Sequence, residues 1–295
     1  MPVLLLHGYT DNSRSWSLLA PHLAGRRLIA LDLRGHGGSA APACCYGIDS
    51  LAQDVDGFLA ALNIDKADVI GHSLGSMTAA TLAAYHPARV DQLVLVSTAA
   101  SVPKAGSDWL WDNVPKLSHP IDPNSEFMLA WYWNPTPVAE DFLSRERAES
   151  AAVPAQVWMG ALKALTLTDW SPLAPRITAP TLVLWGDQDS LFDAASQTRV
   201  KELLPTARHE TFTGLGQAWS DGTGQAYQRG GVQRDQARDA VGALLDECAG
   251  LRGAGVVDED ADAGVITQAR FDRRQVAELS QVCLQHLNGN PVFAV

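Results

Sequence analysis

The chain has 295 residues, a length that suits a single α/β domain carrying an insertion. Its net charge of −11 argues against nucleic acid or an anionic membrane surface as a partner. No apolar run reaches membrane-spanning length, no secretory leader is visible, and the four cysteines lack metal-ligand spacing. We therefore expect a cytoplasmic protein with reduced thiols, no metal site and no cofactor.

Strands and helices are predicted to alternate along the chain. Helical spacing of apolar residues is found at 48–62, and residues 15–23 also read as a helix. The strands predicted in the first hundred residues are apolar, which is typical of a parallel sheet covered by helices on both faces. Outside the central motif described next, strands are predicted at 2–6, 27–33, 92–97, 181–185 and 208–213.

The central motif is Gly71-His72-Ser73-Leu74-Gly75, which follows an apolar run and precedes a series of small residues. This pattern predicts a strand, a sharp turn and a helix. Such a turn exposes the serine hydroxyl, and the glycines two residues before and after it let the strand and helix approach. Ser73 would then lie at a helix N-terminus, where backbone N–H groups favour developing negative charge. The chemistry indicated is acyl transfer through an acyl-enzyme on Ser73.

Four motifs in this order and at these separations resemble the α/β-hydrolase superfamily, in its esterase, haloperoxidase-like and carbon–carbon hydrolase branch. The resemblance covers residues 1 to about 220. It implies an α/β-hydrolase fold, with a mostly parallel sheet, helices on both faces and a helical lid. The motifs are Leu6-His7-Gly8-Tyr9, Asp32-Leu33-Arg34-Gly35-His36-Gly37, Gly71-His72-Ser73-Leu74-Gly75 and Leu184-Trp185-Gly186-Asp187-Gln188-Asp189.

The resemblance implies a hydrolase core formed by residues 1–100 and 171–249. Residues 101–170 take the position of the lid and hold six of the nine tryptophans. These rings are expected to roof an apolar substrate pocket, to form the core of the lid itself, or both. Residues 250–295 read as an acidic linker and a C-terminal helix of unknown role.

The family normally has a strand pair before the His-Gly strand, and this chain starts inside that strand. We therefore expect N-terminal strands to be missing, which leaves one sheet edge exposed to pairing. The C-terminal tail is expected to cover that edge. A homodimer that forms through the exposed edge or through the C-terminal helix is the alternative.

The resemblance also assigns residues around Ser73. One oxyanion-hole N–H comes from Leu74, directly after the nucleophile, and the family places the other on Tyr9. Asp189 matches the family's acid, which orients an imidazole, and Asp187 is the alternative.

The family places its catalytic histidine after the last strand, within Gly-x-Gly-His. Here the stretch is Gly214-Leu215-Gly216-Gln217, so Gln217 stands at the usual histidine position. An amide does not accept and return a proton near neutral pH, so it cannot serve as a general base. It can still hydrogen-bond Ser73 Oγ. His119 and His286, on segments whose placement the sequence leaves open, are the alternative bases.

The expected activity is hydrolysis of carboxylic esters of small, partly apolar substrates. Two alternatives stay open: a catalytically impaired binding protein with the same fold, and a carbon–carbon bond hydrolase. Epoxide hydrolase and haloalkane dehalogenase chemistry is disfavoured, because those relatives have an aspartate at the position of Ser73.

Overall fold

The computed structural model describes residues 1–23, 25–135, 137–217 and 267–269. The predictions for His286, the acidic linker and the C-terminal helix lie outside the described residues. Among the helices that are described, none is long and apolar enough to cross a membrane.

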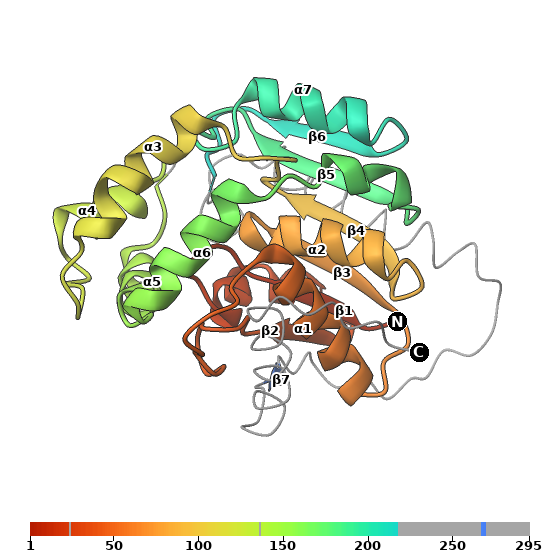
Figure 1. The fold of residues 1–295 in the computed structure, drawn as a ribbon, viewed down its shortest axis with the longest axis horizontal. Coiled ribbons are helices and arrows are strands. Elements are labelled where there is room, and N and C mark those ends of the chain that lie inside the picture. The colour runs from red at the N-terminus through yellow and green to blue at the C-terminus, as the bar shows by residue number, and fades with distance from the viewer. Residues whose placement is uncertain (24, 136, 218–266, 270–295) are drawn as a thin grey trace, which may run out of the picture.

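A parallel sheet forms the centre of the molecule, in the order β6-β5-β4-β3-β1-β2-β7 (Figure 1). Every pair of neighbouring strands is parallel, which confirms the predicted sheet. The strands are β1 (Val3–Leu6), β2 (Leu28–Leu31), β3 (Ala67–His72), β4 (Val90–Val96), β5 (Thr181–Gly186), β6 (Arg208–Phe212) and β7 (Thr267–Ala269).

Both faces of the central strands are apolar and buried. Along β1, Leu4 and Leu6 belong to one hydrophobic cluster, whereas Val3 and Leu5 belong to another. Because neighbouring side chains of a strand point to opposite faces, a strand covered on both sides reads as a continuous apolar run. This is why the strands could be located from the sequence.

Two of the helices that flank the sheet are those predicted. The helix expected at 48–62 is α1 (Ile48–Ala61), and the one after Ser73 is α2 (Leu74–Tyr85). The prediction of one helix at 15–23 is wrong, because this stretch forms two short 3-10 helices instead. The remaining elements around the sheet are η1 (Ser13–Leu18), η2 (Ala20–Leu23), η4 (Ser171–Arg176) and α7 (Ala194–Leu203).

Residues 101–170, called the helical segment below, form a separate group of helices at the end of the sheet where β3 and β4 terminate (Figure 1). An antiparallel bridge between Ser101 and Asp169 joins the two ends of the segment. Trp158 and Trp170 are fully buried, whereas Trp133 is 70% exposed. The helices are α3 (Lys104–Asn113), η3 (Val114–Lys116), α4 (Glu126–Trp131), α5 (Glu140–Ala151) and α6 (Ala155–Leu167).

Two further expectations concern the sheet edge and the cysteines. The edge beyond β2 is paired by β7, with Ile29 opposite Thr267 and Leu31 opposite Ala269. Cys44 is a free thiol, whereas Cys45 is disulfide-bonded. The expectation of four reduced thiols is therefore wrong at Cys45.

Candidate active site

Ser73 occupies a strained turn between β3 and α2. Its φ of 50° and ψ of −116° lie in a region that residues with a side chain rarely adopt. A Cβ on Gly71 would collide with the carbonyl of Gly75, and one on Gly75 would collide with the carbonyl of Leu6. The two glycines therefore let α2 start directly against β3 and β1, and this close packing keeps Ser73 in its unfavourable conformation.

Leu74 and Tyr9 are the residues expected to supply the oxyanion-hole N–H groups. Leu74 is the first residue of α2, so its N–H belongs to the first turn, which has no intrahelical acceptor. Tyr9 follows the end of β1, the strand that neighbours β3, and lines the same cavity as Ser73. Its phenol is directed away, donating to the carbonyl of Trp158 at 2.7 Å. Burial raises the pKa of Tyr9 well above its usual range, so this phenol remains a neutral donor.

Asp189 follows β5 and is 5% exposed. Burial raises the pKa of its carboxyl to about 7, although the N–H groups of Leu191 and Phe192 donate to Oδ1 and favour the charged form. Asp187, the alternative, is directed elsewhere and accepts from the N–H of Gly214 at 2.7 Å. Asp189 is the acid that faces Gln217.

The side-chain amide of Gln217 bridges Ser73 and Asp189. In the orientation that gives each amide atom a complementary partner, Nε2 donates to Asp189 Oδ2 and Oδ1 at 2.5 and 2.7 Å. Oε1 then accepts from Ser73 Oγ at 2.8 Å. In the opposite orientation, Nε2 donates to Ser73 Oγ at the same distance. The amide thus has two possible hydrogen-bond arrangements, and the ionised carboxylate of Asp189 favours the first because it can only accept.

Two contacts hold the loop that carries Gln217, one to the turn at Ser73 and one to the loop after β5. His72 Nε2 lies 2.9 Å from the Gln217 carbonyl oxygen, which identifies Nε2 as the protonated ring nitrogen. The N–H of Gln188 donates to the carbonyl of Leu215 at 2.8 Å, joining the loops after β5 and β6. His72, the residue before Ser73, therefore helps to fix the backbone that carries the Gln217 amide.

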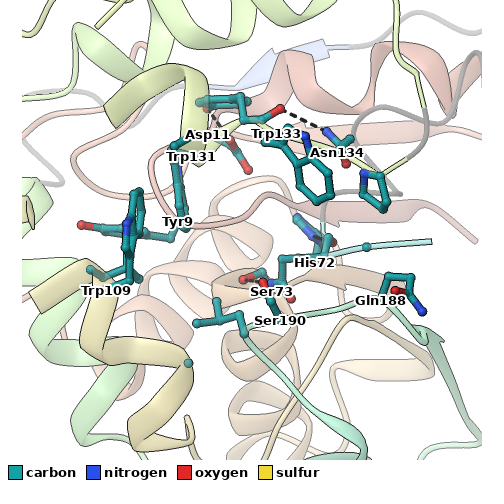
Figure 2. Close-up of a pocket in the computed structure, with 18 of the residues that line it drawn as sticks. Tyr9, Asp11, His72, Ser73, Trp109, Trp131, Trp133, Asn134, Gln188 and Ser190 are labelled. Carbon is teal, nitrogen blue, oxygen red and sulfur yellow. Dashed lines mark hydrogen bonds between the residues drawn. The ribbon is translucent and has the colours of Figure 1, made fainter. Parts of the chain in front are cut away.

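A cavity of about 430 Å³ opens beside Ser73. Figure 2 shows Tyr9, Trp109 and Trp131 grouped on one side of Ser73, and Trp133 facing His72. Most of its roof comes from the helical segment, which contributes Trp109, Leu110, Trp131, Tyr132, Trp133, Phe142 and Leu143. The tryptophans thus serve in both of the ways anticipated, since Trp158 is core and Trp131 faces the cavity.

The other histidines that are described lie apart from this arrangement. His7 is fully buried; its Nδ1 is 2.8 Å from the Gly8 carbonyl and its Nε2 accepts the N–H of Leu33 at 2.9 Å. It therefore ties the end of β1 to the end of β2. His119 is exposed and is not among the described residues that line the cavity. His209 lies in β6, within reach of the Leu204 carbonyl rather than of Ser73.

Asp11 and Tyr132 were not anticipated as part of the site. Asp11 is 8% exposed and lines the cavity, and its Oδ1 accepts the phenol proton of Tyr132 at 2.9 Å. Burial, followed by the charges of Asp11 and Glu146, raises the pKa of Tyr132 well above its usual range. No pattern in the sequence marks this pair, because its members are 121 positions apart and meet only when the helical segment closes over the sheet.

Comparison with known proteins agrees with this architecture. A family model described as alpha/beta hydrolase fold matches residues 1–216. An uncharacterized protein of Mycobacterium tuberculosis is 41% identical over 96 residues, 32% of this chain and 28% of that protein, so the chain matches less than a third of that relative. Lipase 3 of Moraxella is 26% identical over 219 residues, covering 70% of this chain and 68% of the lipase.

Solved structures show the same likeness. An esterase from Exiguobacterium antarcticum superposes with a TM-score of 0.70 at 20% identity, over 83% of this chain and 92% of the esterase. An E-2-(acetamidomethylene)succinate hydrolase gives a TM-score of 0.69 at 21% identity, over 83% of this chain and 91% of that chain. At these identities the likeness concerns the fold.

Proposed function

We propose, from the premise that the chain belongs to the α/β-hydrolase fold family, that it hydrolyses carboxylic esters of small, partly apolar substrates through an acyl-enzyme on Ser73. The observation that carries the proposal is the line of hydrogen bonds from Ser73 Oγ through the Gln217 amide to Asp189. We further infer that Gln217 takes the place of the family's histidine. Relatives named lipase and esterase support the reaction class.

The reaction would proceed in two steps. Ser73 Oγ attacks the ester carbonyl carbon, the C–O bond to the alcohol breaks, and the serine proton ends on the released alcohol. Water then attacks the acyl carbonyl, releases the carboxylic acid and returns a proton to Ser73 Oγ. In both steps, the N–H groups of Leu74 and Tyr9 would stabilise the oxyanion.

Gln217 limits the rate of this cycle. Its Oε1 accepts the serine hydrogen bond and orients the nucleophile, but the amide does not take up the proton. The oxyanion hole and substrate binding alone supply about 10³–10⁴ over water. Deacylation suffers more than acylation by an activated ester, since a phenolate leaves without protonation whereas water attack requires a base. We therefore expect the acyl-enzyme to accumulate.

Intact-protein mass spectrometry after mixing with 4-nitrophenyl butyrate tests the proposal. Wild type should gain one butyryl group and release nitrophenol in a burst followed by slow turnover. Ser73→Ala should show neither, and a fluorophosphonate probe should label wild type but not this variant. Absence of both labels from folded wild type would sink the proposal.

A second candidate is a binding protein without turnover. The observation that favours it is that both ends of the Gln217 amide are satisfied by Ser73 and Asp189. It predicts ligand binding that is the same in wild type and Ser73→Ala, with no acylation. Carbon–carbon bond hydrolysis remains a third candidate on the same fold, which substrate profiling separates from esterolysis.

We also propose that the helical segment, residues 101–170, acts as the lid over residues 1–100 and 171–249. Support comes from the cavity, whose roof is built largely from that segment. The anticipated partner is therefore a small-molecule ester.

A further inference from the structure

The cavity beside Ser73 has an uneven charge distribution. Asp11 is the one carboxylate among the described residues that line it, and no lysine or arginine belongs to that set. The carboxylate is held in place by the phenol of Tyr132 on Oδ1. A carboxylate-bearing ligand would therefore meet a negative charge in a lining that holds no lysine or arginine.

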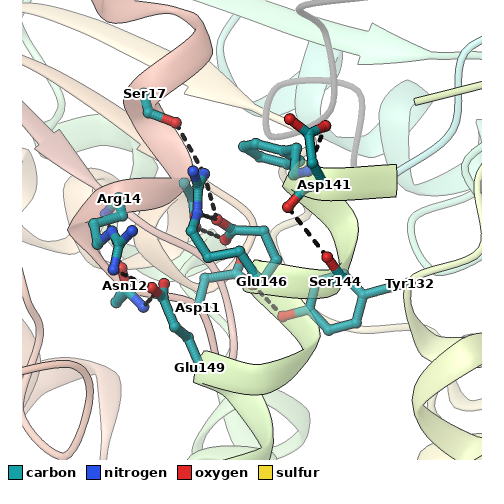
Figure 3. Close-up of polar contacts among 12 residues, drawn as sticks. Asp11, Asn12, Arg14, Ser17, Tyr132, Asp141, Ser144, Glu146 and Glu149 are labelled. Carbon is teal, nitrogen blue, oxygen red and sulfur yellow. Dashed lines mark hydrogen bonds and ion pairs between the residues drawn. The ribbon is translucent and has the colours of Figure 1, made fainter. Parts of the chain in front are cut away.

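The charges behind Asp11 are paired with one another and do not reach the cavity lining. Figure 3 shows Asp11 and Glu146 near the same Tyr132 ring. Glu146 is 2% exposed and pairs with Arg145 at 3.1 Å, while Glu149 pairs with Arg14 at 2.5 Å. The two arginines are thus engaged by glutamates outside the cavity lining.

His72 also lies close to Asp11. A Cβ placed on Gly8 would lie 2.7 Å from Asp11 Oδ2 and 2.9 Å from His72 Nδ1, so both atoms approach the same point. The pair carries one negative charge while the imidazole is neutral and none once it is protonated. When the imidazole is neutral, Asp11 therefore presents its negative charge to a ligand in the cavity.

The remaining walls suit a cation as well. Tyr9, Trp109 and Trp131 line the cavity, and Trp131 contacts the other two, with ring centroids 5.8 Å apart for Tyr9–Trp131 and 6.3 Å for Trp109–Trp131. Aromatic faces attract ammonium groups through their quadrupole, and the attraction grows when the site is shielded from water. Aromatic rings beside a buried carboxylate form the environment that quaternary ammonium groups prefer.

We propose that this cavity selects ligands that join a cationic group, such as a quaternary ammonium, to an aromatic or apolar body, and that Asp11 is the specificity-determining residue. As a statement about substrates, the proposal rests on the ester hydrolysis proposed above. As a statement about binding, it is independent of turnover.

Isothermal titration calorimetry at pH 8.5 with three ligands of similar size tests the proposal: benzyltrimethylammonium, neutral benzyl alcohol and anionic phenylacetate. In wild type the ammonium should bind at least about tenfold more tightly than benzyl alcohol, and phenylacetate should bind most weakly. Asp11→Asn, which keeps an acceptor for Tyr132, should lower the ammonium-to-phenylacetate affinity ratio at least about tenfold.

Asp122→Asn is the matched control, because Asp122 is an exposed carboxylate of the helical segment outside the cavity lining. It makes the same change in net charge and should leave the ratio unaltered. The proposal is overturned if phenylacetate or benzyl alcohol binds wild type as tightly as the ammonium, or if Asp11→Asn and Asp122→Asn behave alike. The wild-type ordering decides the matter even if Asp11→Asn does not fold. A protein without ester turnover leaves this test intact, and an active esterase that prefers phenylacetate contradicts only this proposal.

Discussion

The side chain of Gln217 is within hydrogen-bond distance of both carboxylate oxygens of Asp189, at 2.5 and 2.7 Å, while its other end meets Ser73 Oγ at 2.8 Å. A Ser-His-Asp triad has an imidazole in this place, hydrogen-bonded to the same two partners. The amide reproduces the connections of that imidazole without its ability to carry a proton.

Gln217→His should therefore create a working general base. We expect kcat/KM for a short-chain activated ester to rise by at least about 10²-fold, within the 10²–10⁴-fold that positioned base catalysis contributes. Steady-state kinetics with 4-nitrophenyl butyrate measures the change. Gln188→His is the matched control: Gln188 lines the same cavity but bonds Asp187 rather than Ser73, so its replacement should leave the rate nearly unchanged. A folded Gln217→His variant as slow as wild type would contradict the assignment.

The rate of Ser73 acylation should depend on the ionisation of Asp189. Above pH 7 the charged carboxylate can only accept, so Nε2 of Gln217 faces it and Oε1 orients the serine hydroxyl. Below pH 7 the protonated carboxyl of Asp189 donates to Gln217 Oε1. Gln217 Nε2 then donates a hydrogen bond to Ser73 Oγ. The acylation rate should therefore rise as the pH is raised through about 7, in addition to any dependence on hydroxide.

Asp189→Asn identifies the origin of that rise. The ratio of wild-type to variant acylation rates, measured by fluorophosphonate labelling from pH 5 to pH 9, should rise through pH 7. Burial raises the pKa of Asp189, and His72, when it is protonated, opposes that rise electrostatically. A constant ratio over this range would show that Asp189 does not control the orientation of the amide.

The strained turn that exposes the Ser73 hydroxyl should lower the stability of the fold. Its positive φ is tolerated by glycine without strain, and such strain costs about 1–3 kcal/mol in other residues. We expect Ser73→Gly to melt at a higher temperature than Ser73→Ala, the reverse of the order at an ordinary position. Thermal unfolding of both variants at one pH compares them, and a lower melting temperature for Ser73→Gly would argue against strain.

The two glycines of the turn should resist substitution. Gly75→Ala places a methyl group against the carbonyls of Leu6 and His7, so we expect a loss of about 3 kcal/mol or more in the free energy of unfolding. In Gly57→Ala the added Cβ meets nothing within 4 Å, and the site lies inside α1. That control should gain about 0.5–1 kcal/mol. Denaturant unfolding curves give both values, and an equal effect of the two changes would refute the close approach.

Much of the fold could be predicted from the sequence alone. Continuous apolar runs such as Val3–Leu6 located the parallel strands, because a strand buried on both faces has no position for a polar side chain. Gly71 and Gly75 marked the turn because only glycine lets α2 begin so close to β1 and β3. The stretch at 15–23 was misread as one helix because apolar spacing alone does not distinguish 3-10 turns from an α-helix.

Other features were decided only by tertiary structure. Ser73, Asp189 and Gln217 come from loops after three different strands, and their distances depend on how those loops are tied together. The contact between His72 and the Gln217 carbonyl is one such tie. The Asp11–Tyr132 pair depends on how the helical segment docks, which no local pattern encodes. Hydrogen-bond geometry is set to within tenths of an ångström by packing, whereas sequence patterns specify only which face of an element is buried.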